Sequence, residues 1–225
     1  MTNNMTTIEK CAACGLFRGM DPEEIASALA RFHARVAQYD KSAVILHAGD
    51  RTKSLALVLE GSVTIQSDDL WGNRTILTMI GTGGLFAETY ALLHETLLVD
   101  AVANTRSEIL FLDITHLREI SETETPWSAK FLSRLLTIAA KKNLTLASRS
   151  FDTAAKTIRG RVMSYLNSIA LKEHARSFEI PFDRQQLADY LNVERTALSK
   201  ELGKMQREGL VDFRKNHFEI LGTSA

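Results

Sequence analysis

Cysteine is scarce in this chain of 225 residues, which contains only two. Two thiols cannot complete a four-thiolate zinc or iron–sulfur site in one chain, nor build a disulfide framework. The two residues, Cys11 and Cys14, have the C-x-x-C spacing that can support redox chemistry or half of a metal site. The alternative is that both are small, partly buried residues of a first helix.

Long apolar runs and an excess of charge of one sign are also missing. The longest apolar runs, such as residues 55–59, are too short to span a bilayer, so we expect no membrane partner. No signal peptide is visible in the polar residues 1–7, which predicts a cytoplasmic protein. Basic and acidic residues number 27 each, which argues against a protein that coats nucleic acid by charge alone.

Familiar catalytic motifs are absent from the sequence. It contains no P-loop, no G-x-S-x-G and no H-E-x-x-H, and the glycine-rich residues 81–84 do not lead into the Lys-Ser/Thr start of a phosphate-binding helix. We therefore expect no enzyme, no catalytic residue, no metal and no cofactor. With 45% hydrophobic and 24% charged residues the chain is globular, and its length allows one large domain or two ordinary ones.

Short β-branched segments separated by glycine turns fill the region from residue 43 to residue 113. This pattern is typical of a sandwich or barrel of many short strands. The sequence Trp71-Gly72-Asn73 predicts a turn between two of them. The expected strands cover residues 44–46, 54–59, 63–65, 75–80, 99–102 and 109–112.

A long helix is predicted from Pro126, with Thr125 as its cap. Residues 127–149 contain no glycine or proline, and apolar residues recur three to four apart on more than one side. Such a helix needs a second partner, and we expect its own copy in a homodimer; the alternative is a helix packed within one chain. Residues 150–153 interrupt the pattern, and Asp152 or Thr153 can cap a new helix that reaches about residue 170.

The C-terminal region has the local signals of two helices joined by a tight turn. Asp183 is an N-cap with Gln186 as its capping-box partner, Asn192 suits a left-handed turn, and Gly209 ends the second helix. The two helices are expected over residues 184–191 and 194–207. Their shared apolar core is expected to contain Leu187, Leu191, Val193, Leu198, Leu202 and Met205.

One face of the second helix combines cations and hydroxyls without a carboxylate. This composition suits the major groove of DNA, because long donors reach guanine edges and phosphates. Residues 210–213 and 217–220 then form a hairpin whose basic tip, Arg214-Lys215-Asn216, could touch phosphate as a wing. A winged helix-turn-helix that binds DNA is predicted, and the alternative is a helical domain that binds protein. The face consists of Arg195, Thr196, Ser199, Lys200 and Gly203.

The whole chain resembles the CRP/FNR family of bacterial transcription regulators. The resemblance implies an α+β protein with an effector-sensing β-roll, a double-stranded β-helix or jelly roll, over residues 1–125. A long dimerisation helix over residues 126–150 and a winged helix-turn-helix over residues 151–225 would follow. The implied partners are a second copy, double-stranded DNA with a near-palindromic site, and RNA polymerase. The motifs that carry the resemblance are Gly49-Asp50, residues 58–61, 71–74, 84–88 and 184–191, and Arg195-x-x-Leu198-Ser199-Lys200-x-Leu202.

The resemblance also assigns roles to individual residues of the DNA-binding domain. Arg195 falls at the first base- or phosphate-contacting position, and Thr196, Ser199 and Lys200 fall at base-reading positions. Better-known members carry glutamate at the Thr196 position and arginine at the Lys200 position, so their target sequence is not assumed here. Phosphate contacts fall to Arg184 and Gln185, and Lys204 completes the DNA-binding candidates.

The effector implied by the resemblance is a small molecule other than cyclic AMP. Glu88 matches the glutamate of the cyclic-AMP cassette, but the phosphate-binding arginine is replaced by Leu97 or Leu98, and Leu146-Ala147 replaces a Thr-Ser pair. The alternatives are that there is no effector, and that Glu88 is held by backbone N–H groups of its own turn. The candidate effector-binding residues are Gly84, Phe86, Ala87, Glu88, Thr89, Leu97 and Leu98.

A haem or redox sensor of the same fold is a further alternative. The iron–sulfur branch of the family needs four cysteines, whereas haem-sensing relatives use an axial histidine. Histidines in proteins are more often surface or hydrogen-bonded residues than haem ligands, and the same is the alternative for each histidine of this chain. In any of these cases, the effector is expected to act through a hinge at residues 150–153. The histidines to consider are His33, His47, His94 and His116.

Overall fold

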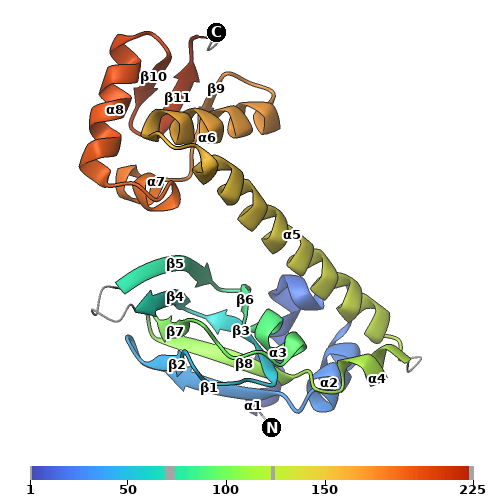
Figure 1. Ribbon diagram of the computed structural model, residues 1–225. Helices are drawn as coiled ribbons and strands as arrows, with labels where there is room; N and C mark the ends of the chain where they lie inside the picture. Colours follow the sequence, from blue (N-terminus) through green and yellow to red (C-terminus); the bar gives the residue numbers. More distant parts are fainter. Residues whose placement is uncertain (1, 69–73, 123–124, 223–225) are drawn as a thin grey trace. The chain divides into compact units, whose positions relative to one another are not determined.

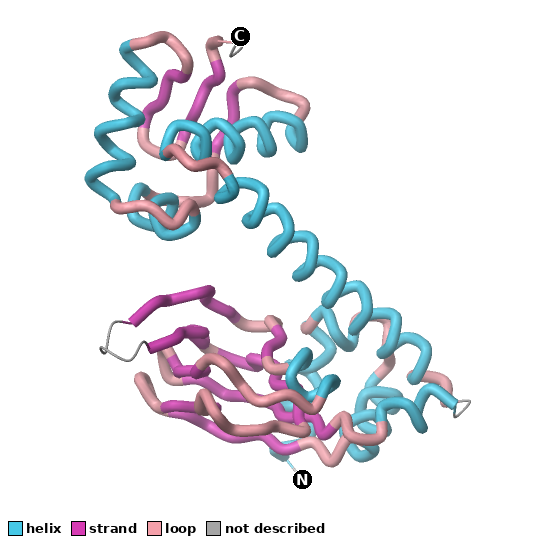
Figure 2. The backbone as a smooth tube through the Cα atoms, viewed as in Figure 1, coloured by secondary structure: helices cyan, strands magenta, loops and turns pink. Residues whose placement is uncertain are grey.

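The computed structural model describes residues 2–68, 74–122 and 125–222, so the predicted turn at Trp71-Gly72-Asn73 lies outside the described residues. The chain divides into two compact units, Met1–Ile138 and Ala139–Ala225. Strands dominate the first unit and helices the second (Figure 2). None of the helices in the described part of the chain is long and apolar enough to cross a membrane.

Two four-stranded antiparallel sheets form the β-roll of the first unit (Figure 1). All six strands expected there are present, each shifted by at most two or three residues at its ends. The first sheet has the order β1 (Arg35–Tyr39), β8 (Ser107–Asp113), β3 (Ser54–Glu60), β6 (Leu85–Phe86). The second has the order β2 (Val44–Leu46), β7 (Asp100–Ala103), β4 (Ser62–Asp68), β5 (Arg74–Gly81).

The central strand β3 is buried on both of its faces. Ala56 and Val58 belong to the apolar interior of the roll, where they meet Val63 and Ala101 of the opposite sheet. The alternate residues of β3 belong to a second core between this sheet and the helices around it. Those residues are Leu55, Leu57 and Leu59.

Helices cover the outer face of the first sheet. An aromatic cluster joins them: the ring centroids of Phe32 and Phe131 are 4.6 Å apart, and those of Phe32 and Trp127 are 5.6 Å apart. Both cysteines are buried in the same core. The helices of this unit are α1 (Thr2–Ala13), the short 3-10 helix η1 (Gly15–Phe17), α2 (Pro22–Arg31), α3 (Glu88–Leu93) and α4 (Leu117–Glu122), with the first turns of α5 (Ser128–Ala154).

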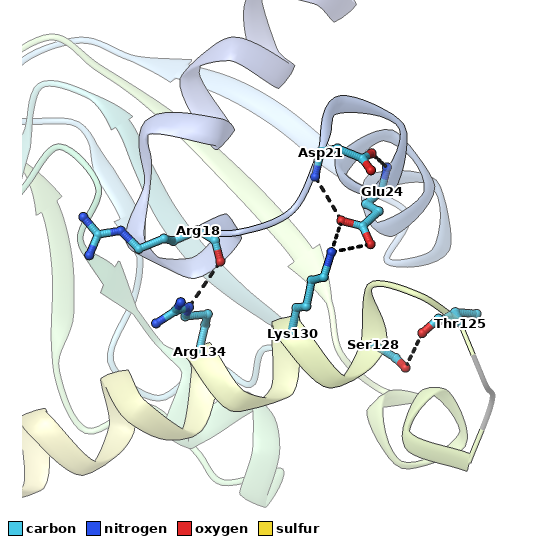
Figure 3. Close-up of polar contacts among 7 residues, drawn as sticks. All are labelled: Arg18, Asp21, Glu24, Thr125, Ser128, Lys130 and Arg134. Atoms are coloured by element: carbon cyan, nitrogen blue, oxygen red, sulfur yellow. Dashed lines mark hydrogen bonds and ion pairs between the residues drawn. The ribbon is translucent and has the colours of Figure 1, made fainter.

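Polar contacts fasten the start of α5 to the N-terminal helices (Figure 3). The Lys130 ammonium lies 2.7 Å from both carboxylate oxygens of Glu24, which also closes the capping box of α2 with Asp21. The Arg134 Nε donates to the backbone carbonyl of Arg18 at 3.2 Å. The predicted cap of α5 is wrong, because the buried Thr125 hydroxyl has no hydrogen-bond partner among the described residues and the helix begins at Ser128.

The predicted interruption at residues 150–153 is also wrong, because α5 continues through it to Ala154. Asp152 and Thr153 cap nothing: the Thr153 hydroxyl donates to the carbonyl of Arg149, one turn earlier. The chain turns at residues 155–157 instead. Thr157 caps α6 (Ile158–Glu173) by accepting from the Gly160 N–H at 3.0 Å.

The second unit is a helix-turn-helix followed by a hairpin. The Asp183–Gln186 capping box, the left-handed Asn192 (φ 53°) and the left-handed Gly209 (φ 70°) are all confirmed. The elements after α6 are β9 (Ser177–Glu179), α7 (Arg184–Tyr190), α8 (Arg195–Arg207), β10 (Val211–Arg214) and β11 (His217–Ile220). The three strands form one sheet in the order β10-β11-β9. The predicted core residues lie in this unit's core or pack against it.

Candidate nucleic-acid interface and effector region

Helix α8 separates a buried apolar side from an exposed polar side, as its residue spacing predicts. Leu198, Leu202 and Met205 are fully buried. Arg195, Thr196, Ser199 and Lys200 are all exposed on the other side, so the structure brings the predicted base-reading set together. The described residues offer Arg195 no hydrogen bond or ion pair, which leaves its guanidinium available for a partner.

Two acids, Glu201 within α8 and Glu208 at its C-cap, pair with an arginine of α6. Arg159 of α6 pairs with both Glu201 and Glu208, at 2.7 Å in each case. Lys204, another predicted DNA-binding residue, lies 3.9 Å from Glu208 and is exposed. These ion pairs join α6 to α8 and neutralise two carboxylates, so the exposed side of α8 keeps its positive charge.

A carboxylate that the sequence analysis did not foresee sits at the beginning of α8. Glu194 is the N-cap residue and accepts from the N–H of Thr196 at 3.1 Å, from the N–H of Ala197 at 2.9 Å, and from the Thr196 hydroxyl. The hydrogen bond from that hydroxyl, followed by those from the two amides, lowers the pKa of Glu194. The predicted face itself contains no acid, but the Glu194 carboxylate borders its N-terminal end through the hydrogen bond with Thr196.

Arg184 makes contacts inside the domain that its sequence position did not predict. Its guanidinium lies 4.9 Å from the ring centroid of Phe213 and 5.7 Å from that of Phe218, and burial lowers its pKa. This cation–π stacking holds the start of α7 against the hairpin. Gln185 is exposed and donates to Asp189 at 2.8 Å. The phosphate contacts expected of both residues stay predictions.

The hairpin tip is basic and exposed. The turn consists of Lys215 and Asn216, directly after Arg214 at the end of β10, and Lys215 has the left-handed φ of 57°. The Asn216 carbonyl accepts from the Ile180 N–H at 2.9 Å, which anchors the turn to the segment after β9. The predicted wing is thus present with its cations in solvent.

The seven predicted effector residues do not share one surface. Phe86, Glu88 and Leu97 are buried, whereas Thr89 is exposed and Leu98 is 74% exposed. Leu97 is held by its backbone, which pairs with Gly49 and Asp50 at 2.8 Å each. Gly84 is needed for packing, because a Cβ there would overlap the side chain of Ile80. Ala87 adopts a left-handed φ of 62° as the N-cap of α3.

The buried apolar cluster inside the roll contains Phe86. Polar side chains are buried in the first unit as well: Thr64, Gln66, Glu88 and Ser107 are each at most 6% exposed. Two open cavities lie elsewhere in this unit. One of about 580 Å³ is lined by α1, α2, β1 and β8, and one of about 730 Å³ lies beside α3 and α4. None of the seven predicted residues lines either cavity.

The histidines and cysteines have ordinary structural surroundings. His94 ends α3 in a left-handed conformation, and His116 lies 2.9 Å from Glu119. Within the described ranges, no three His, Cys, Asp or Glu side chains gather as a metal site. Burial, followed by the nearby Cys14, raises the pKa of Cys11 to about 12, and burial raises that of Cys14. High pKa values disfavour the reactive thiolate, which supports the structural interpretation of the C-x-x-C pair.

Two family models match separate parts of the chain. Residues 36–124 match the cyclic nucleotide-binding domain, and residues 160–225 match the Crp-like helix-turn-helix domain. The chain belongs to the CRP/FNR family. This family consists of DNA-binding transcription regulators and not of enzymes.

The similarity to other CRP/FNR proteins extends over almost the whole chain. The cAMP-activated global transcriptional regulator Vfr of Pseudomonas aeruginosa is 24% identical over 203 residues, which are 87% of this chain and 92% of that protein. The cyclic AMP receptor protein of Thermus thermophilus is 29% identical over 210 residues, 91% of each. The crystal structure of the Thermus thermophilus catabolite activator protein is 27% identical, with a TM-score of 0.50, and covers 92% of this chain and 93% of its own.

In this CRP/FNR protein, a buried carboxylate ties the last turns of α5 to the helix-turn-helix. Asp152 is only 2% exposed and accepts from the Tyr190 hydroxyl of α7 at 2.9 Å and from the Ser164 hydroxyl of α6 at 3.2 Å. Burial, followed by the hydrogen bond to Asp152, raises the pKa of Tyr190. The Arg149 guanidinium donates to the carbonyls of Tyr190 and Asp189 at 3.0 and 2.9 Å.

A second arginine joins two turns of the same unit. Arg161 donates to the carbonyl of Ala155 at 2.8 Å, in the turn between α5 and α6. It also donates to the carbonyls of Leu191 and Asn192 at 3.1 and 2.9 Å, in the turn between α7 and α8. The region in which we expected a hinge is therefore held by several hydrogen bonds.

Replacing Asp152 with alanine is expected to loosen this connection. The variant leaves two partly buried hydroxyls without their acceptor, at a cost of about 2–4 kcal/mol to the local stability of the unit. Hydrogen exchange of the α7 amides should become faster, as measured on the full chain. Tyr190→Phe removes only one donor and should cost about 1 kcal/mol. Unchanged exchange in Asp152→Ala would show that the carboxylate does not hold the helices together.

Proposed function

We propose that this CRP/FNR regulator binds a near-palindromic DNA site as a homodimer and responds to a small effector other than cyclic AMP. The observation that carries the DNA-binding part is the exposed set of Arg195, Ser199 and Lys200 on a helix whose own acids pair elsewhere. An α-helix fits the major groove, and such donors suit guanine edges and phosphates. The basic wing adds a backbone contact without sequence preference.

Replacing Arg195 or Lys200 with alanine is expected to weaken binding to the selected site about 10- to 100-fold, because each loss removes a donor to a base or a phosphate. Binding isotherms of the full chain across a salt series measure the effect. Arg31→Ala removes an exposed cation of the first unit and serves as the control for charge. If Arg195→Ala and Lys200→Ala bind as the native chain does, the C-terminal domain contacts something other than DNA.

The homodimer part of the proposal is supported by large apolar side chains left exposed on α5. Each of these side chains is between 65% and 75% exposed. A helix that stays in water normally exposes less apolar surface along one segment. Leu136, Leu144 and Phe151 follow one another at spacings of eight and seven residues, which keeps them on one stripe of the helix. The fourth such side chain is Leu146. A second copy of α5 fits that stripe.

A glutamate at Leu144 is expected to convert the dimer into a monomer. Pairing of two such stripes would bury the new carboxylates against each other and against apolar surface. Analytical ultracentrifugation measures the mass. Thr145→Glu places the same charge about 100° around the helix from Leu144, away from the stripe, and should stay dimeric. A Leu144→Glu variant that sediments as a dimer would contradict the use of this stripe.

The effector part of the proposal is supported by the leucines that occupy the place of the phosphate-binding arginine. Leu97 is buried and Leu98 points to solvent, so neither supplies a charge-assisted partner for a cyclic phosphate. The two relatives named above for cyclic AMP therefore differ from this chain in what they bind.

Cyclic AMP is expected to leave the melting temperature and the DNA affinity unchanged. A ligand at about ten times its Kd would stabilise the folded state by about 1.4 kcal/mol, which thermal denaturation resolves. The titration to about 1 mM is run on the full chain. A clear rise in melting temperature, or a cyclic-AMP-dependent gain in DNA binding, would contradict this part of the proposal and leave the DNA-binding role intact.

The fastening of α5 to α7 supports a lever mechanism for the response. Because Asp152 and Arg149 hold the last turns of α5 to α7, a rearrangement of the paired α5 helices would carry the helix-turn-helix with it. The effector must bind one arrangement more tightly than the other in order to shift the population. This mechanism replaces the predicted hinge at residues 150–153.

A further inference from the structure

The beginning of α8 carries an arrangement that the DNA-binding role does not by itself explain. Glu194 and Thr196 are both exposed, two residues apart, and joined by a hydrogen bond between their side chains. Ordinary N-capping needs only one side-chain acceptor for the free amides, and a serine or threonine provides it. Here a glutamate supplies the cap and also accepts a hydrogen bond from the neighbouring hydroxyl.

We propose that Glu194 and Thr196 act as one hydrogen-bond acceptor that reads an exocyclic amino group, of cytosine or adenine, in the major groove. The inference rests on the DNA-binding role of α8. It adds a specificity-determining residue, Glu194, that lies just before the helix and outside the predicted base-reading set.

The direction of the hydrogen bonds decides what this pair can offer. A threonine hydroxyl has one proton, and that of Thr196 is directed to Oε2 of Glu194. Its remaining lone pairs can only accept. Thr196 therefore cannot donate to guanine O6, to thymine O4 or to a phosphate while the pair is intact.

The Glu194 carboxylate retains capacity to accept from a base. A carboxylate has about four lone-pair positions. Two amides and one hydroxyl occupy three of them: the N–H of Thr196 on Oε1, and the N–H of Ala197 and the Thr196 hydroxyl on Oε2. About one position remains, on Oε1.

The major groove contains only two kinds of donor that suit such a pair. Cytosine presents N4–H₂ and adenine presents N6–H₂, whereas guanine and thymine present acceptors at their groove edges. A fixed carboxylate also disfavours those acceptors by repulsion, so the pair discriminates in both directions. Lys200, four residues after Thr196, acts on Glu194 through its charge and offsets the repulsion between that carboxylate and the DNA backbone.

Two substitutions separate this role from a role as a helix cap. Glu194→Ser keeps an N-cap side chain, of a type preferred at that position, but removes the carboxylate. Thr196→Val removes the hydroxyl, keeps the shape, and leaves the carboxylate capped by the two amides. Glu173→Ser is the matched control, since Glu173 is an exposed carboxylate at the end of α6.

The experiment is selection of DNA duplexes from a randomised pool by each full-length protein, followed by measured affinities for single-base variants of the selected site. The native chain and Glu173→Ser are expected to require a cytosine or an adenine at one position of each half-site. Glu194→Ser and Thr196→Val should both lose discrimination at that same position, about ten-fold or more, and keep it elsewhere. Their melting temperatures should equal that of the native chain.

Three results would overturn the proposal. Glu194→Ser could keep the native base preference, or it could bind every duplex more tightly by the same factor, and in either case the carboxylate does not read a base. Loss of preference at different positions in the two variants would show that the two side chains do not act as one unit. A native chain that selects no sequence would instead remove the DNA-binding role on which the proposal rests.

Discussion

The buried carboxylate of Asp152 is the contact on which the arrangement of the C-terminal unit depends. A buried charge is costly unless hydrogen bonds satisfy it, and here two hydroxyls from α6 and α7 do so. The three helices are thereby fixed around one residue of α5. Arg161 adds the second constraint, because its single guanidinium binds both the turn before α6 and the turn within the helix-turn-helix. The DNA-binding domain therefore begins inside α5, and the last turns of that helix are part of it.

Polar groups shared between elements also determine the charge on the surface of α8. The acids of the helix body are drawn to Arg159, so the exposed side keeps its cations. The acid at the N-cap is handled differently, since it is satisfied by amides and by a hydroxyl and stays in solvent. Charge on this helix is thus sorted by position: positive along its exposed side and negative only at its beginning. A protein without net charge can in this way present one surface suited to DNA.

Local sequence signals predicted most of the fold. They failed where contacts with residues distant in the sequence determine the role of a side chain. The capping box of Asp183, the turn at Asn192 and the stop at Gly209 follow from each residue's own chemistry, and all three are present. Asp152 resembled a cap for the same local reason, but its partners come from α6 and α7, so the helix continues through it. The exposed base-reading set followed from the 3.6-residue period. The carboxylate of Glu194 did not, because a residue before the helix has no place in that period.

The double burial of β3 makes neighbouring residues of one strand belong to different cores. Leu57 lies in the core under the helices that carry the start of α5, whereas Val58 lies in the interior of the roll. The two side chains are consecutive in the sequence yet sense separate surroundings. The methyl resonances of Leu57 and Val58 would therefore report independently. That of Leu57 senses the packing of the helices around the start of α5, and that of Val58 senses changes in the interior of the roll. A single strand gives access to both signals without altering any residue of the DNA-binding domain.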